Sequence, residues 1–136
     1  MDDYVLVTRQ IFGETIAYLK ESFEVVDNQE DKILSADELC RLMGNALGVQ
    51  TSTNDRIDGP LLDKCPKLKV VSNTAVGYDN IDVAACTKRG VMVTNTPGVL
   101  DETVADYAMA LVLSATRKIT QGERYLREKK WKKNSL

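Results

Sequence analysis

The stretch Leu68–Asn95, LKVVSNTAVGYDNIDVAACTKRGVMVTN, decides the fold because it holds two strand signals with a helix signal between them. The runs LKVVSN and VMVTN are short, apolar and β-branched, as in strands that are buried on both faces. The intervening NIDVAACTKRG fits a helix that begins after a cap at Asn80 and ends before Gly90. This order of signals predicts two parallel strands joined by a crossover helix.

The same alternation of strand and helix signals occurs upstream. Strand-like runs lie at 4–8, 23–27 and 46–51, and helix signals lie at 11–19, 35–44 and 58–65. Ser35 and Glu38 have the spacing of a capping box, and Pro60 falls in a first helical turn, where proline is tolerated. Five strands alternating with four helices predict an α/β fold, a five-stranded parallel sheet with helices on both faces.

The composition indicates an ordinary water-soluble protein. The chain has 136 residues, enough for one compact domain, with 43% apolar residues, 28% charged residues and a net charge of -2. No apolar run approaches the roughly 18 to 20 residues that span a bilayer, and the N-terminus is acidic where a signal peptide is basic. We therefore expect a cytoplasmic protein.

The cysteine and histidine content narrows the chemistry. Cys40, Cys65 and Cys86 are odd in number and far apart, and the sequence contains no His. We expect the three cysteines to be small buried hydrophobic residues, and we expect neither a disulfide framework nor a metal site. Without His, acid–base chemistry near neutral pH would need carboxylates or Lys.

The last twenty residues are basic. Residues 117–136 contain eight Lys or Arg against two Glu, with Trp131 among them. Such a segment could contact nucleic acid or an anionic membrane, but no companion basic face or aromatic pattern lies upstream. We favour a solvated helix end and expect neither partner.

A different kind of helix is predicted over Thr103–Thr116. A turn at Pro97–Gly98 precedes it, Asp101 can cap it, and its residues are apolar or small almost all round, apart from Asp106 and Tyr107. A helix that is apolar on every side must be covered on every side. The segment therefore predicts a second body, either another domain, another subunit or both.

The loop within NTAVGYDNID (Asn73–Asp82) is a candidate binding site. It runs from the end of one strand to the start of a helix, where ligands bind in open parallel sheets. Ala75 and Val76 have plain side chains, and Gly77 lets the chain turn and brings backbone N–H groups close to a bound group. Such a nest suits a small anion such as a carboxylate, although a simple glycine turn is the commoner reason for this pattern.

The same loop lacks a cation. No Arg or Lys lies between Lys69 and Lys88, so an anion bound here would have to find a charged partner elsewhere.

From Leu68 to Arg117 the chain closely resembles the amino-terminal part of the D-isomer-specific 2-hydroxyacid dehydrogenases, most of all the glyoxylate, hydroxypyruvate and 2-ketogluconate reductases. The segments AVGYDNID, GVMVTNTPGVL and ETVAD occur in the family's order and spacing, and RYLREKKWKK also fits. Up to Pro66 the resemblance depends mainly on the pattern of elements. The chain covers less than half of the family's usual length.

The resemblance implies a flavodoxin-like substrate domain followed by a Rossmann domain that binds NAD or NADP. Residues 1–99 then form an incomplete substrate-binding domain, and residues 100–136 form the crossover helix and the truncated start of the NAD(P)-binding domain. The crossover helix commonly lies near the dimer contact, so the resemblance also implies a homodimer. The implied ligand is a small 2-oxo or 2-hydroxy carboxylate.

The resemblance also implies roles for particular positions. The backbone amides of Val76 and Gly77 hold the substrate carboxylate, and Leu100 and Thr53 match positions near the substrate. Val76 and Val104 line the nicotinamide side of the cofactor. Some relatives have Ser or Thr at one or both of these two positions, so Val offers only backbone and apolar contact.

The chain lacks several of the family's functional motifs. The fingerprint G-x-G-x-x-G is absent, and the family's catalytic Arg, Glu and His lie beyond residue 136. We therefore expect the chain alone to be inactive as an oxidoreductase. Two alternatives stay open: D-3-phosphoglycerate dehydrogenase of serine biosynthesis, and a non-catalytic corepressor-like interaction module.

Overall fold

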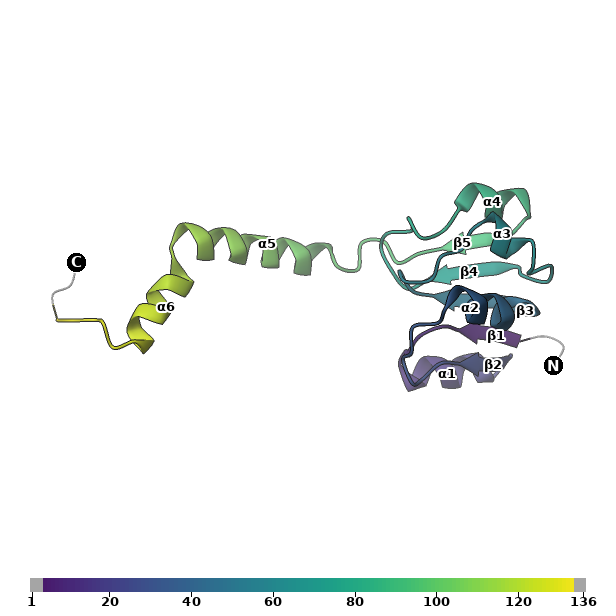
Figure 1. Ribbon diagram of the computed structural model, residues 1–136, viewed down its shortest axis with the longest axis horizontal. Coiled ribbons are helices and arrows are strands. Elements are labelled where there is room, and N and C mark those ends of the chain that lie inside the picture. The colour runs from purple at the N-terminus through teal and green to yellow at the C-terminus, as the bar shows by residue number, and fades with distance from the viewer. Residues whose placement is uncertain (1–3, 134–136) are drawn as a thin grey trace. The chain divides into compact units, whose positions relative to one another are not determined.

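The computed structural model describes residues 4–133. The chain divides into two compact units, Met1–Pro97 and Gly98–Leu136. The first unit contains a sheet of five parallel strands in the order β2-β1-β3-β4-β5 (Figure 1). The strands are β1 (Tyr4–Val7), β2 (Glu24–Asp27), β3 (Ala46–Thr51), β4 (Val70–Asn73) and β5 (Met92–Thr94). This is the flavodoxin-like strand order, and it confirms the predicted fold class.

Four helices connect these strands, as the alternation of signals predicts. They are α1 (Gly13–Lys20), α2 (Ala36–Met43), α3 (Gly59–Leu62) and α4 (Val83–Lys88). The capping box of α2 is confirmed, because the Ser35 hydroxyl accepts a hydrogen bond from the Glu38 N–H at 3.3 Å and Glu38 Oε2 accepts one from the Ser35 N–H at 2.9 Å. Pro60 lies in the first turn of α3.

Two predicted helix starts are wrong. The helix predicted from residue 11 begins at Gly13, with Phe12 at the N-cap. The cap of α4 is Asp82, whose Oδ1 accepts a hydrogen bond from the Ala85 N–H at 2.8 Å, and Asn80 does not cap it. The helix starts later because the residue after Asn80, Ile81, is buried and forms a parallel β-bridge with Ile57.

The hydrophobic core lies on one face of the sheet. Leu6, Val49 and Val71 of the central strands are at most 1% exposed. They belong to one cluster with buried residues of the three helices α2, α3 and α4: Leu39, Met43, Leu62 and Cys86. Because side chains alternate along a strand, their neighbours in sequence point to the opposite face.

The opposite face carries α1 and stays partly open. Val5, Gly48 and Val70 line an apolar hollow there together with Thr15 and Leu19 of α1. Position 48 suits glycine, because a Cβ at this position would lie 2.9 Å from Cγ1 of Val70. Helices thus lie on both faces, but one face is covered less completely.

The cysteines match the prediction in part. Cys65 and Cys86 are buried, Cys40 is half-buried, and all three are free thiols. Burial, with a smaller contribution from Cys40, raises the pKa of Cys65 to about 11, and burial also raises the pKa of Cys86. No helix within residues 4–133 is both long and apolar enough to cross a membrane.

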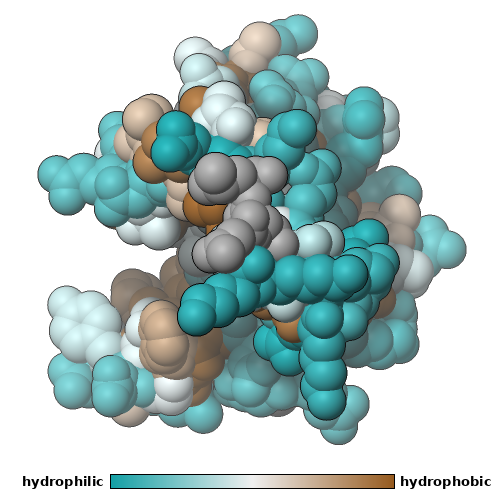
Figure 2. Space-filling model, turned by 90° about the vertical axis from the view of Figure 1, so that its left-hand side faces the viewer, coloured by the Kyte–Doolittle hydropathy of each residue, from teal (hydrophilic) through white to brown (hydrophobic). Residues whose placement is uncertain are grey.

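The second unit consists of α5 (Asp101–Thr116) and α6 (Ile119–Arg127). Asp101 is the first residue of α5, so its predicted role as the cap is wrong; Leu100 occupies the N-cap without a side-chain hydrogen bond. No residue of α5 is buried, and large apolar side chains such as Tyr107, Met109 and Leu113 are more than half exposed. Figure 2 shows brown hydrophobic patches exposed among hydrophilic side chains on one face of the molecule.

Candidate carboxylate-binding loop

The loop between β4 and α4 lies at the carboxyl edge of the sheet, as its sequence predicts. It begins at a buried residue, Asn73, which is 1% exposed. Val76, Gly77 and Tyr78 then lie at the surface, with Val76 39% and Tyr78 53% exposed. The part of the loop that is available to a ligand is therefore the backbone of these three residues and the side chains of two of them.

Three successive carbonyl groups of this loop are engaged by hydrogen bonds. The Ala75 carbonyl accepts from the Thr96 N–H at 2.9 Å. The Val76 carbonyl accepts from Nδ2 of Asn95 at 2.8 Å, and the Gly77 carbonyl accepts from Nδ2 of Asn73 at 2.9 Å.

These anchors orient the N–H groups that follow each carbonyl. In a trans peptide the C=O and the N–H of the same unit point in opposite directions, and the described chain contains no cis peptide bond. The N–H groups of Val76 and Gly77 therefore point away from Thr96 and Asn95. Neither N–H donates a hydrogen bond to any residue within 4–133. Together they form a pair of oriented donors without an internal acceptor.

Gly77 does not have the role in the turn that the sequence suggested. The glycines with left-handed backbone in the described chain are Gly90 (φ 69°), which follows α4, and Gly98 (φ 78°). A Cβ at position 77 would meet nothing within 4 Å. Neither the backbone conformation nor packing within the chain requires glycine here. The missing side chain leaves open space beside the free N–H.

Two asparagine side chains, the buried Asn73 and the half-buried Asn80, join this loop to the neighbouring loop after β3. Asn73 Oδ1 accepts from the Thr51 hydroxyl at 3.1 Å, and its Nδ2 also donates to Oδ1 of Asn80 at 3.2 Å. Asn80 in turn donates to the carbonyls of Ser52 at 3.1 Å and Asp55 at 2.9 Å. The two loops at the carboxyl edge are thus held in one network.

The loop after β3 is fixed by Asp55, which is 3% exposed. Its Oδ2 accepts from the Thr8 hydroxyl at 2.5 Å and from the Ser52 N–H at 2.9 Å. Thr53 is exposed between Ser52 and Asp55. The structure therefore joins the segment that carries Thr53 to the segment that carries Val76 and Gly77, through Asn80.

Leu100 and Val104 belong to the second unit. They form the first turn of α5, where the Val104 N–H donates to the Leu100 carbonyl at 2.8 Å. Their side chains are 51% and 58% exposed. Their assignment to the substrate and the nicotinamide stays a prediction.

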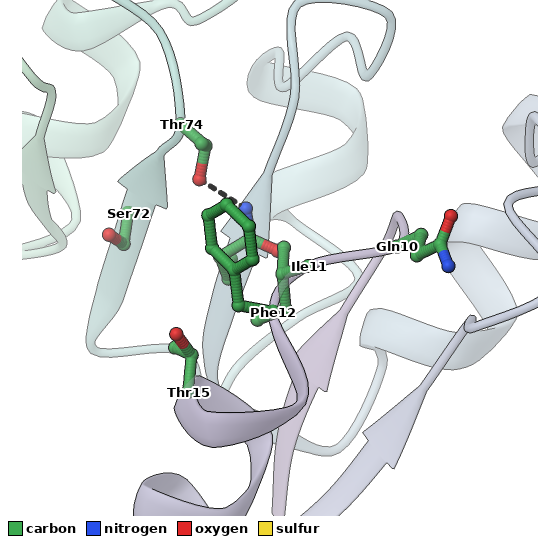
Figure 3. A pocket seen from close by; sticks show the side chains of 7 residues that line it. Gln10, Ile11, Phe12, Thr15, Ser72 and Thr74 are labelled. Carbon is green, nitrogen blue, oxygen red and sulfur yellow. Dashed lines mark hydrogen bonds between the residues drawn. The ribbon is translucent and has the colours of Figure 1, made fainter.

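A second hollow lies next to the start of α1 (Figure 3). It has a volume of about 570 Å³ and is lined by residues of three segments: Gln10, Ile11, Phe12, Thr15, Gln50, Ser72 and Thr74. The dashed line in Figure 3 marks the hydrogen bond that Nε2 of Gln50 donates to the Thr74 hydroxyl. The other side-chain atom of Gln50, Oε1, is buried and has no partner within the described residues. No sequence pattern predicted this hollow. It shares Thr15, Gln50 and Ser72 with the apolar hollow described above.

Comparison with known proteins places these features in a family context. The family model described as D-isomer specific 2-hydroxyacid dehydrogenase, catalytic domain, matches residues 5–125. Glyoxylate reductase from Korarchaeum cryptofilum is 41% identical over 132 residues, and that from Pyrococcus horikoshii is 39% identical over 136 residues. The matches cover 97% and 100% of this chain but only 40% and 41% of the two relatives.

A solved structure of a reductase is also similar to this chain. It is the NADPH-dependent glyoxylate/hydroxypyruvate reductase from Sinorhizobium meliloti in complex with NADP and malonate. The TM-score is 0.68 at 37% identity, and the match covers 96% of this chain and 40% of that one. The chain thus spans about two fifths of the length of the relatives that it matches.

Proposed function

The chain belongs to the D-isomer specific 2-hydroxyacid dehydrogenase family, and from this membership we propose that it is the substrate-binding portion of an NAD- or NADP-dependent oxidoreductase. In this proposal the intact protein reduces a small 2-oxo acid, of the glyoxylate or hydroxypyruvate type, to the D-2-hydroxy acid. The observation that carries the proposal is the pair of oriented, internally unused N–H groups at Val76 and Gly77. The glyoxylate reductases at 41% and 39% identity support the substrate class.

The carboxylate of the substrate accepts hydrogen bonds from these two N–H groups. Donors that are already oriented need no rearrangement when the anion arrives, which favours binding. The absence of Arg and Lys between Lys69 and Lys88 leaves the anion's charge to a cation from outside the loop. Thr53 and Leu100 contribute the remaining contacts with the substrate in this proposal.

We propose that the two units have different roles, one in binding substrate and the other in binding the cofactor. Residues 1–99 form the substrate-binding domain, and residues 100–136 form the crossover helix and the start of the NAD(P)-binding domain. The boundary between the compact units, at Pro97 and Gly98, supports this division.

The residues of this chain fit only one edge of the nucleotide cofactor. Val76 and Val104 are exposed apolar residues that suit the nicotinamide side. The sequence contains no G-x-G-x-x-G loop for the phosphates. When bound, the cofactor supplies the hydride. This chain's own contribution is to hold the carboxylate in position.

Carboxylate binding by this loop can be tested directly in the 136-residue chain. Oxamate, an unreactive analogue of a 2-oxo acid, is titrated into the ¹⁵N-labelled protein, with neutral acetamide as the control ligand. We expect the amide resonances of Val76 and Gly77 to shift with oxamate and not with acetamide, at millimolar affinity because no cation assists. Shifts confined to other parts of the chain would contradict the proposal.

We also propose that the 136-residue chain does not transfer hydride by itself. Reduction of a 2-oxo acid requires a bound cofactor and a proton donor for the carbonyl oxygen. The sequence contains neither a G-x-G-x-x-G loop for the cofactor nor a His, the residue whose ordinary pKa suits this proton transfer near neutral pH. Oxidation of NADH or NADPH by the pure chain is measured by absorbance with glyoxylate or hydroxypyruvate present. We expect no turnover above the rate without protein, and sustained turnover would refute this part of the proposal.

The exposed apolar surface of α5 favours self-association, so we propose a homodimer that forms through this helix. Leu111, Leu113 and Met109 are each more than half exposed in the single chain. Sedimentation velocity is expected to detect a dimer that Leu111→Glu converts to monomer. The same surface would serve a non-catalytic interaction module, and binding of oxamate at Val76 and Gly77 separates the two functions.

A further inference from the structure

Asn95 follows directly after β5 and crosses to the loop that bears Val76 and Gly77. Thr94, the last residue of β5, pairs with Ser72 of β4, so the backbone that leads into Asn95 is held by the sheet. The Thr96 N–H and Nδ2 of Asn95 then donate to two successive carbonyls, those of Ala75 and Val76. These two hydrogen bonds continue the contact between β4 and β5 beyond the last residues of both strands.

The two hydrogen bonds control different peptide units. The Thr96 N–H fixes the unit whose N–H belongs to Val76, and it depends on the backbone alone. The Asn95 side chain fixes the unit whose N–H belongs to Gly77. Only the second hydrogen bond depends on a side chain of the segment after β5, so it can be removed by shortening that side chain while the backbone hydrogen bond stays.

Nothing else in the described chain provides the same restraint on this peptide unit. Gly77 has no side chain, a Cβ there would contact nothing within 4 Å, and the Gly77 N–H has no internal acceptor. The Gly77 carbonyl is held separately, by Asn73, and belongs to the next peptide unit. The orientation of the Gly77 N–H is therefore set mainly by the contact between Asn95 and the Val76 carbonyl.

We infer that Asn95 is a positioning residue that aims the Gly77 N–H at the carboxylate of the substrate. The inference depends on the proposed function for its ligand, but the orienting contact itself exists without one. Asn95 lines a small hollow together with Tyr78, Val83 and Val93, so its side chain has free space around it. The hydrogen bond, and not tight packing, holds the Asn95 amide against the loop.

The test compares Asn95→Ala with the matched variant Asn45→Ala. Asn45 is exposed before β3, at the amino edge of the sheet, and has no part in the loop. In the ligand-free ¹⁵N-labelled chain, we expect Asn95→Ala to lower the order parameter of the Gly77 N–H while that of the Val76 N–H is retained. With oxamate, we expect the affinity to fall about fivefold to tenfold, which is what the loss of one oriented hydrogen bond costs.

Two further variants separate positioning from simple structural support. Asn95→Asp has nearly the same shape but has no donor for the Val76 carbonyl, so it should behave like Asn95→Ala. Asn95→Gln keeps an amide donor on a longer side chain and should recover part of the affinity. All variants should keep the unfolding temperature within a few degrees of the parent, because the contact is at the surface.

The outcomes are distinguishable. An ordered Gly77 N–H and unchanged oxamate affinity in Asn95→Ala would overturn the inference. If the parent chain does not bind oxamate, the proposed function fails, and the ligand-free order parameter of the Gly77 N–H alone decides the role of Asn95.

Discussion

The two units of the chain differ in how many of their apolar side chains are buried by contacts within the same unit. In the first unit, buried apolar residues of α2, α3 and α4 are packed against the sheet, and the buried amide of Asn73 has hydrogen-bond partners. In the second unit, α5 has no buried residue although its side chains are largely apolar. Thus the first unit has the contacts of a self-supporting domain, whereas the second has the surface of a helix built to contact something else.

The comparison also applies within the first unit. At the carboxyl edge of the sheet the carbonyls of Ala75, Val76 and Gly77 are hydrogen-bonded, whereas the N–H groups of Val76 and Gly77 have no acceptor within residues 4–133. On the less covered face, Oε1 of Gln50 has no hydrogen-bond partner among residues 4–133, and apolar strand residues line a hollow. Free donors at the loop suit a small anion, whereas a broad apolar hollow suits a larger covering surface.

The largest expected effect is on the free energy of unfolding, and a matched pair of methionine substitutions, one in each unit, measures it. Met43 of α2 is 0% exposed and Met109 of α5 is 57% exposed. We expect Met43→Ala to lower the free energy of unfolding by about 2 to 5 kcal/mol, because it leaves a cavity in the core. Met109→Ala should change it by less than about 0.5 kcal/mol in dilute solution. Urea denaturation measures both.

Equal free energies of unfolding for the two methionine variants would contradict the proposed difference in packing between the two units. At concentrations where the chain associates, Met109→Ala should instead weaken self-association. A dilution series therefore separates the loss of a contact between copies from the loss of a contact within one chain.

The second expected effect concerns the buried amide under the loop. Asn73→Ala removes the donor to the Gly77 carbonyl and the acceptor for the Thr51 hydroxyl. Because Asn73 is buried, the groups left without partners should cost about 1 to 3 kcal/mol in the free energy of unfolding. Ser72→Ala, at an exposed neighbouring position, is the control and should cost far less. Equal stability of the two variants would show that the amide network contributes little.

A third expectation uses the cysteines as reporters of the first unit. Cys65 is buried and its pKa is raised to about 11, whereas Cys40 is only half-buried. Since the thiolate is the reactive form, we expect Cys40 to be modified first by a thiol reagent, at least about tenfold faster than Cys65 and Cys86. Mass spectrometry of the partly labelled protein identifies the site. Met109→Ala should leave all three rates unchanged, and acceleration there would indicate that α5 protects the first unit.

Sequence patterns predicted the fold well because its elements have strong local signals. Short β-branched runs alternating with capped helices specified five parallel strands, and the capping box at Ser35 and Glu38 formed as expected. The predicted start of α4 was wrong because a contact between residues far apart in the sequence determines where this helix begins. The bridge between Ile57 and Ile81 keeps the chain extended past Asn80 and leaves Asp82 to cap the helix.

The site was predicted by position but not by mechanism. The end of a strand before a helix correctly drew attention to Val76 and Gly77 as exposed backbone. The left-handed turn that glycine favours is absent at Gly77, and the groups that orient the two N–H donors are the Thr96 N–H and the Asn95 side chain. Asn95 lies 19 residues from Val76, so only the folded sheet brings them together. An asparagine directly after a strand at the carboxyl edge was the one available signal.

The smallest expected effect is a pH dependence at the capping box of α2, in the self-supporting unit. The Lys32 ammonium, and then the N–H and hydroxyl of Ser35, lower the pKa of Glu38 from 4.5 to about 2. A carboxyl with a depressed pKa stabilises the folded state fully above its unfolded pKa and loses that contribution as the pH falls toward its folded pKa.

The unfolding temperature of the parent should therefore exceed that of Glu38→Gln by a small margin at neutral pH. The margin should shrink between pH 4.5 and about pH 2. Glu30→Gln, at another exposed carboxyl, is the control. A margin that stays constant through this range would mean that the charge on Glu38 adds nothing to the cap.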